Sequence, residues 1–138
     1  MGLARPDDAW ARSRLTPEEY ALFLRLDPRD REHAVLVAKE LLRCYPEAPG
    51  EAVRAALLHD VGKVVRPYNP VERILAALFE PWLPALPEKP LLPGWRGAAQ
   101  VRLYHERYGL KLIQDPAVRA HLEEGPWAER IAEVDREF

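Results

Sequence analysis

His59 and Asp60 are adjacent in the segment AALLHDVGK, at the point where an apolar helix is expected to end. An imidazole beside a carboxylate is a mixed donor set that suits a hard or borderline divalent cation. A cation held in this way lowers the pKa of a bound water and turns it into a nucleophile near neutral pH. The pair therefore points to metal-assisted hydrolysis as the first chemistry to consider.

His33 is the first candidate for a further ligand, because the chain has only four histidines. It begins the segment HAVLVAKELL and borders an apolar helical stripe that continues through Val37 and Leu41. A lone histidine in this position is more often a satisfied core residue. Since a second helix supplies His59 and Asp60, a shared cation site is the better interpretation.

Other hydrolytic nucleophiles are scarce in this sequence. The only serine, threonine and cysteine are Ser13, Thr16 and Cys44. Ser13 lies in a polar segment, Thr16 is expected to cap a helix, and no glycine-rich phosphate loop is present. Water activated by a metal ion is therefore the favoured route, with the thiol of Cys44 as an open alternative.

The composition is that of a soluble globular protein in one domain. The 138 residues are 48% hydrophobic and 30% charged. The net charge of −2 argues against nucleic acid as the main partner. The single cysteine excludes an internal disulfide, and no secretory signal or membrane-spanning apolar run is present. We therefore expect a cytoplasmic protein that does not bind membranes.

Helix-start signals recur along the chain, most often as a capping residue followed by proline. The helices expected on this basis span residues 17–26, 28–44, 51–60, 70–79, 97–112, 116–124 and 126–138. No alternating strand pattern competes with them. The sequence thus predicts an all-α bundle of six to seven helices. It forms a single domain over residues 1–138, in which residues 1–26 hold an N-terminal segment and the first helix.

The segment at residues 80–96 differs from the rest, because it contains five of the 14 prolines and the residues Trp82 and Trp95. Proline at this density blocks helix and sheet and favours an extended chain. One interpretation is a long connection within the domain, packed by its own tryptophan and leucine side chains. The other is a lid or a partner-docking loop near the site, which would also suit a homodimer.

Three segments resemble the HD-domain superfamily of metal-dependent phosphohydrolases: DREHAVLVAKELL, AALLHDVGK and a late helix that carries an aspartate. The similarity extends over residues 27–138. It implies an HD-domain-like bundle that binds a divalent ion, which would be Mn, Mg, Fe, Co, Ni or Zn. The ligands that the resemblance implies are His33, His59, Asp60 and Asp135. Asp115 is the rival to the last of these, but its place before Pro116 is typical of a helix N-cap.

The segment YHERYGLKLI resembles a part of the family in which further histidines complete a second metal site. His105 and His121 are the matching residues, although Leu122 stands where the family often has a second, adjacent histidine. His105 would contact either a metal or the substrate. The resemblance also implies that Lys63 is a positive group near the substrate phosphate or near Asp60. The alternative role of Lys63 is that of a cation at a helix C-terminus.

The resemblance implies a metal-dependent phosphohydrolase that cleaves a phosphate ester or anhydride of a nucleotide or another small phosphorylated molecule. Metal-activated water would attack phosphorus, and Asp60 would accept its proton or bridge two ions. Lys63 and His105 would stabilise charge on the phosphoryl oxygens. The alternative is a non-catalytic, metal-stabilised module that senses a nucleotide or binds a partner. A third interpretation is a purely structural bundle without metal.

Overall fold

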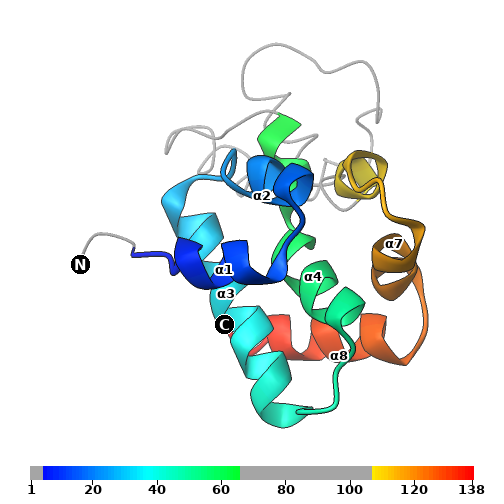
Figure 1. Cartoon of the computed structure of the whole chain (residues 1–138). Helices are drawn as coiled ribbons and strands as arrows, with labels where there is room; N and C mark the ends of the chain where they lie inside the picture. The colour runs from blue at the N-terminus through cyan, green and yellow to red at the C-terminus, as the bar shows by residue number, and fades with distance from the viewer. Residues whose placement is uncertain (1–4, 66–106) are drawn as a thin grey trace, which may run out of the picture.

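The computed structural model describes residues 5–65 and 107–138, and these residues form helices and turns without a strand (Figure 1). The elements are α1 (Asp8–Arg14), α2 (Pro17–Phe23), α3 (Pro28–Cys44), α4 (Gly50–Leu58), the 3-10 helix η1 (Val61–Val65), α7 (Pro116–Glu123) and α8 (Pro126–Asp135). Residues 107–112 are helical as well. The prediction of an all-α bundle is therefore confirmed for the described residues.

Within the described residues, the predicted helix starts at Pro17, Pro28, Pro116 and Pro126 are confirmed. The Thr16 hydroxyl accepts a hydrogen bond from the Glu19 backbone N–H at 3.2 Å, and the Glu19 carboxylate accepts one from the Thr16 N–H at 2.9 Å. The side chains of Asp27 and Asp115 accept backbone N–H groups at the starts of α3 and α7. Gly125 precedes α8 with a φ of 102°, a conformation that glycine adopts without steric cost. Side-chain capping thus sets three of these helix starts, those of α2, α3 and α7.

The N-terminal helix α1 is not among the predicted helices, the first of which begins at residue 17. The Asp7 side chain caps it by accepting the Trp10 N–H at 3.1 Å. The Trp10 ring contacts the charged ends of Arg14 and Lys39, and Ala11 is fully buried. A helix of 7 residues is not stable alone in water, so packing against α3 and α4 holds it. Such tertiary packing leaves a weak signal in the sequence.

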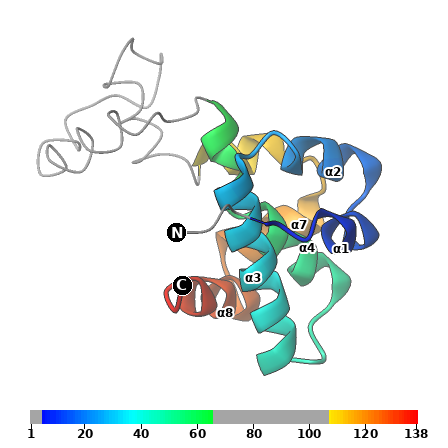
Figure 2. The same ribbon diagram turned by 90° about the vertical axis from the view of Figure 1, so that its left-hand side faces the viewer.

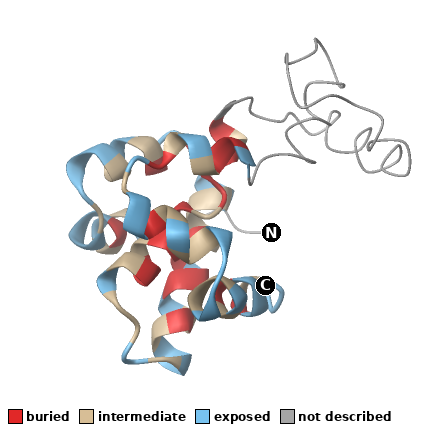
Figure 3. Cartoon of the chain, turned by 90° about the vertical axis from the view of Figure 1, so that its right-hand side faces the viewer, coloured by how far each residue is buried: buried red, intermediate tan, exposed pale blue. Residues whose placement is uncertain are grey.

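Helix α4 forms the centre of the described bundle. It packs against α3 and α7, and α8 also packs against these two helices (Figures 1 and 2). Its buried residues are Ala52, Val53, Ala55, Ala56, Leu57 and Leu58. A helix that is apolar on nearly every side must lie in the interior, and Figure 3 shows the buried residues gathered where these helices meet. The C-terminal end of α4 is thereby enclosed by neighbouring helices.

A polar network also ties α4 to the starts of α2 and α7. The Arg54 guanidinium donates to both carboxylate oxygens of Glu19, at 2.8 and 2.7 Å, and to Asp115 at 2.9 Å. Only 18% of the Arg54 side chain is exposed, so this charge is held among its partners. Asp115 is therefore an N-cap, as its place before Pro116 predicted. It also forms an ion pair with Arg54.

Several predicted segments lie outside the described residues. They are the helix at residues 70–79, the proline-rich segment at 80–96 and the first part of the helix at 97–112. The described part of that helix lies close to η1: a methyl group placed on Gly109 would lie 3.1 Å from the backbone nitrogen of Gly62. Within residues 5–65 and 107–138, no helix is long and apolar enough to cross a bilayer.

Candidate metal centre

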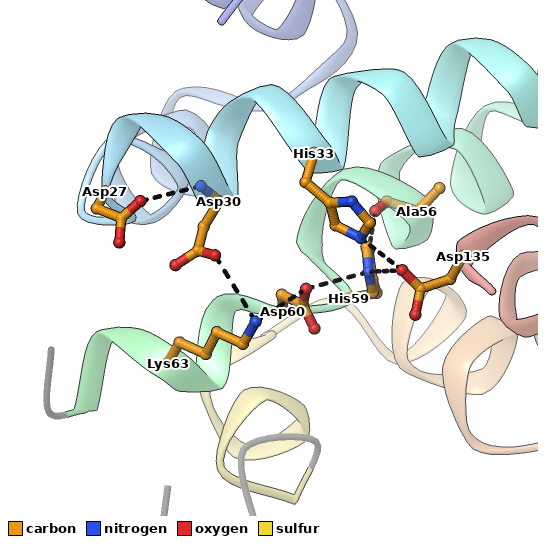
Figure 4. Close-up of polar contacts among 8 residues, drawn as sticks. All are labelled: Asp27, Asp30, His33, Ala56, His59, Asp60, Lys63 and Asp135. Atoms are coloured by element: carbon orange, nitrogen blue, oxygen red, sulfur yellow. Dashed lines mark hydrogen bonds and ion pairs between the residues drawn. The ribbon is translucent and has the colours of Figure 1, made fainter. Parts of the chain in front are cut away.

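Three of the predicted ligands come together at the end of α4 (Figure 4). His33 projects from α3, while His59 and Asp60 form the turn between α4 and η1. One potential ligand atom from each of these residues lies within 4.8 Å of the others. The centres of the two imidazole rings are 5.6 Å apart. The group is therefore close enough to share one small cation.

Asp135, the last residue of α8, lies beside the two histidines. Its Oδ1 atom is 2.5 Å from His33 Nε2 and 3.2 Å from His59 Nε2. The hydrogen bond with His59 is the main reason why the pKa of the Asp135 carboxyl lies below its usual value. The fourth predicted ligand is thus in contact with two of the other three, although 102 residues separate it from His33.

The orientation of His59 is set by the backbone one turn earlier. Its Nδ1 atom lies 2.6 Å from the carbonyl oxygen of Ala56, so that an Nδ1–H group donates to this oxygen. The Nε2 atom then faces Asp60, whose Oδ2 is 3.3 Å away, and Asp135. A metal-ligating histidine normally donates its other ring N–H to a carbonyl or a carboxylate. The contact with Ala56 supplies this arrangement.

Two carboxylates determine the protonation of His59 in the metal-free protein. Burial alone would lower the pKa of this imidazole, because it disfavours the charged form. Hydrogen bonds with Asp135 and Asp60 outweigh burial and raise the pKa of His59 to about 10. The His59 imidazole of the metal-free protein therefore carries this proton at neutral pH. Any cation that binds there through His59 must displace this proton.

We expect the stability of the metal-free protein to fall as the pH rises from 6.5 to about 10. The folded state holds the His59 proton more tightly than the unfolded chain does, and this difference stabilises the fold. The stabilisation is complete below pH 6.5 and is lost as the pH rises through the raised pKa. Urea denaturation in the presence of a chelator at several pH values measures this change. The His59→Gln variant is the control, because it lacks the titrating group. Parallel profiles for the two proteins would contradict the prediction.

Lys63 and Asp30 extend the polar group toward η1. Asp60 is buried, with 7% of the residue exposed, and its Oδ2 lies 3.5 Å from Lys63 Nζ. The same ammonium lies 3.7 Å from Asp30 Oδ1 (Figure 4). Lys63 is thus near Asp60, as one of its two predicted roles requires. Asp30 was not among the predicted residues, although its place three residues before His33 puts both on one helical face.

Of the remaining predicted site residues, only His121 lies within the part of the chain that the structure describes. His121 lies half-buried on α7 and is not among the converging ligand atoms. His105 lies outside the described residues, so a second metal site built from His105 and His121 stays a prediction. Cys44 is exposed at the C-terminal end of α3. Its thiol pKa lies above the usual value because of desolvation and the neighbouring Glu40, which disfavours a thiolate nucleophile.

The chain was compared with protein-family models, with curated proteins and with solved structures, and none of them matches. The site is therefore defined by its own geometry. Its potential metal ligands are the imidazoles of His33 and His59 and the carboxylates of Asp60 and Asp135. Such a donor set suits a divalent ion with mixed nitrogen and oxygen ligands.

Proposed function

We propose that this chain is a metal-dependent phosphohydrolase of the HD-domain type. Its substrate would be a phosphate ester or anhydride of a small molecule, nucleotides included. The observation that carries the proposal is the convergence of His33, His59 and Asp60. Asp135 lies within hydrogen-bonding distance of both histidines. Their order along the chain is the order that the resemblance implies.

The donor set also supports a choice of ion. Two imidazole nitrogens favour Mn, Fe, Co, Ni or Zn over Mg, which prefers oxygen ligands only. When bound, the ion would lower the pKa of a water molecule and polarise a phosphoryl oxygen. His33, His59, Asp60 and Asp135 would hold it. The Ala56 carbonyl would keep the Nε2 atom of His59 directed at it.

The side chains around the ion would accept a proton and stabilise charge during hydrolysis. The water oxygen would form a bond to phosphorus while its proton passes to the Asp60 carboxylate. The bond between phosphorus and the leaving oxygen would break with its electron pair on that oxygen, which would then take up the proton from Asp60. Lys63, held between Asp60 and Asp30, would offset negative charge on the phosphoryl oxygens. His105 is the further candidate for this last role. Water rather than a serine or cysteine side chain would be the nucleophile.

The Asp60→Asn variant tests the proposal. We expect the wild-type protein to hydrolyse para-nitrophenyl phosphate with added Mn²⁺, Co²⁺ or Ni²⁺. The variant should lose at least about 100-fold in kcat, because it removes a ligand and the proton acceptor while keeping the shape of the side chain. Release of para-nitrophenol measures the rate.

The matched control for this experiment is Asp7→Asn, which changes an aspartate at the start of α1, and asparagine caps a helix as well as aspartate does. Its rate should equal that of the wild type. Equal rates for Asp60→Asn and the wild type would refute the proposed mechanism. Tight binding of a nucleotide without turnover would instead support the non-catalytic sensing module.

A further inference from the structure

A pocket of about 340 Å³ opens beside the candidate metal centre. It lies among residues 107–112, α7 and α8, and His59 and Asp135 contribute to its wall. Most of its other described lining is aliphatic: Leu110, Leu122, Ala128, Ile131 and Ala132. A ligand that meets the centre at His59 and Asp135 can therefore extend directly into an apolar space.

The described wall of this pocket offers few hydrogen-bonding groups and no aromatic ring to a nucleobase. Sites that select a base use hydrogen bonds to its polar edge and stacking on aromatic or apolar side chains. No aromatic side chain is among the described lining residues. Outside the centre, the only charged side chains in this lining are Arg107 and Glu123. The volume is also at the low end of the roughly 300–1,000 Å³ of small-molecule sites.

We propose that this pocket holds the organic group of the substrate, and that the substrate is the phosphate monoester of a compact, largely apolar alcohol. The phosphate would meet the His/Asp centre, and one ring or a short branched chain would lie against the aliphatic wall. The assignment of a phosphate group to the substrate rests on the proposed function. The assignment of a compact apolar group rests on the pocket alone.

Two alanines on α8 make the pocket open to a direct test. Ala128 and Ala132 are one helical turn apart and both line the pocket. A larger side chain at Ala132 would fill part of the space, and because Ala132 is exposed it would not disturb the core. Ala120 on α7 is equally exposed and does not line the pocket, so it supplies the matched control position.

The first experiment measures binding by calorimetry to protein saturated with Mn²⁺. Phenyl phosphate should bind the wild type at least about tenfold more tightly than inorganic phosphate, because burial of the ring adds apolar contact. Ala132→Leu should remove this preference and leave inorganic phosphate unchanged, while Ala120→Leu should keep it. AMP that binds more tightly than phenyl phosphate, or equal binding of phenyl and inorganic phosphate, would overturn the proposal.

The second experiment uses metal-free protein and separates the pocket from the proposed chemistry. Phenol is titrated while the backbone amide signals of Gly109, Ala128 and Ala132 are followed by NMR. These signals should shift in the wild type and in Ala120→Leu, but not in Ala132→Leu. Unmoved signals in the wild type would overturn the proposal whatever the metal does. Phenyl phosphate that the Mn²⁺-saturated protein of the first experiment binds without hydrolysing it would contradict the enzyme and leave the pocket assignment standing.

Discussion

The His33→Ala variant should bind Mn²⁺ more weakly than the wild type by more than about 100-fold, because loss even of an outer-shell partner of a metal ligand costs roughly 10–100-fold in affinity. The Nε2 atom of His33 contacts Asp135 and lies in the same small group as His59 and Asp60. With 29% of its side chain exposed, His33 contributes little to the core, so the unfolding free energy should change by about 1 kcal/mol or less. Calorimetric titration with Mn²⁺ and urea denaturation of metal-free protein measure the two effects.

His121→Ala is the matched control for this experiment, because it removes another half-buried histidine from a helix outside the group. Its Mn²⁺ affinity at the centre of His33, His59 and Asp60 should match that of the wild type. Loss of a separate, second Mn²⁺ site in this variant would instead support the predicted pair of His105 and His121. A His33→Ala variant with unchanged affinity and reduced stability would favour the purely structural bundle. Equal losses in both variants would show that affinity depends on the number of histidines rather than on this centre.

The Leu57→Ala variant should lower the free energy of unfolding by about 2–5 kcal/mol, the range for removing a fully buried leucine side chain. Leu57 has no exposed surface and lies in α4, which packs against both α3 and α7. The substitution leaves a cavity two residues before His59, in the helix that positions the centre. Urea denaturation followed by circular dichroism measures the loss.

Leu36→Ala is the control for the core substitution, because Leu36 also lies within a helix but is 44% exposed. Its unfolding free energy should change by less than about 0.5 kcal/mol, as for most surface substitutions. Similar losses at the two positions would show that α4 does not form the centre of the core.

The sequence allowed the helix starts and the main candidate ligands to be predicted, because both depend on short-range chemistry. Thr16, Asp27 and Asp115 are capping residues followed by proline, and each of them caps a helix in the structure. His59 and Asp60 were found from their adjacency at the end of an apolar helix. Their proximity to His33 follows once α3 packs against α4.

The features that sequence reasoning missed depend on contacts between segments far apart in the chain. Helix α1 has a local cap in Asp7, but a helix of 7 residues depends on its packing against α3 and α4. The ion pair of Asp30 with Lys63 required knowledge of how η1 lies against α3. The apolar pocket is formed jointly by residues 107–112, α7 and α8, so that no single segment reveals it.

The close approach of Gly109 to Gly62 has a mechanical consequence. The two backbones pack directly against each other with no side chain between them. A methyl group added at position 109 would lie only 3.1 Å from the Gly62 nitrogen. Gly109 and Leu110 line the pocket, while Gly62 stands between Asp60 and Lys63 in sequence. A side chain larger than hydrogen at position 109 would therefore push the pocket wall away from the turn that carries Asp60 and Lys63.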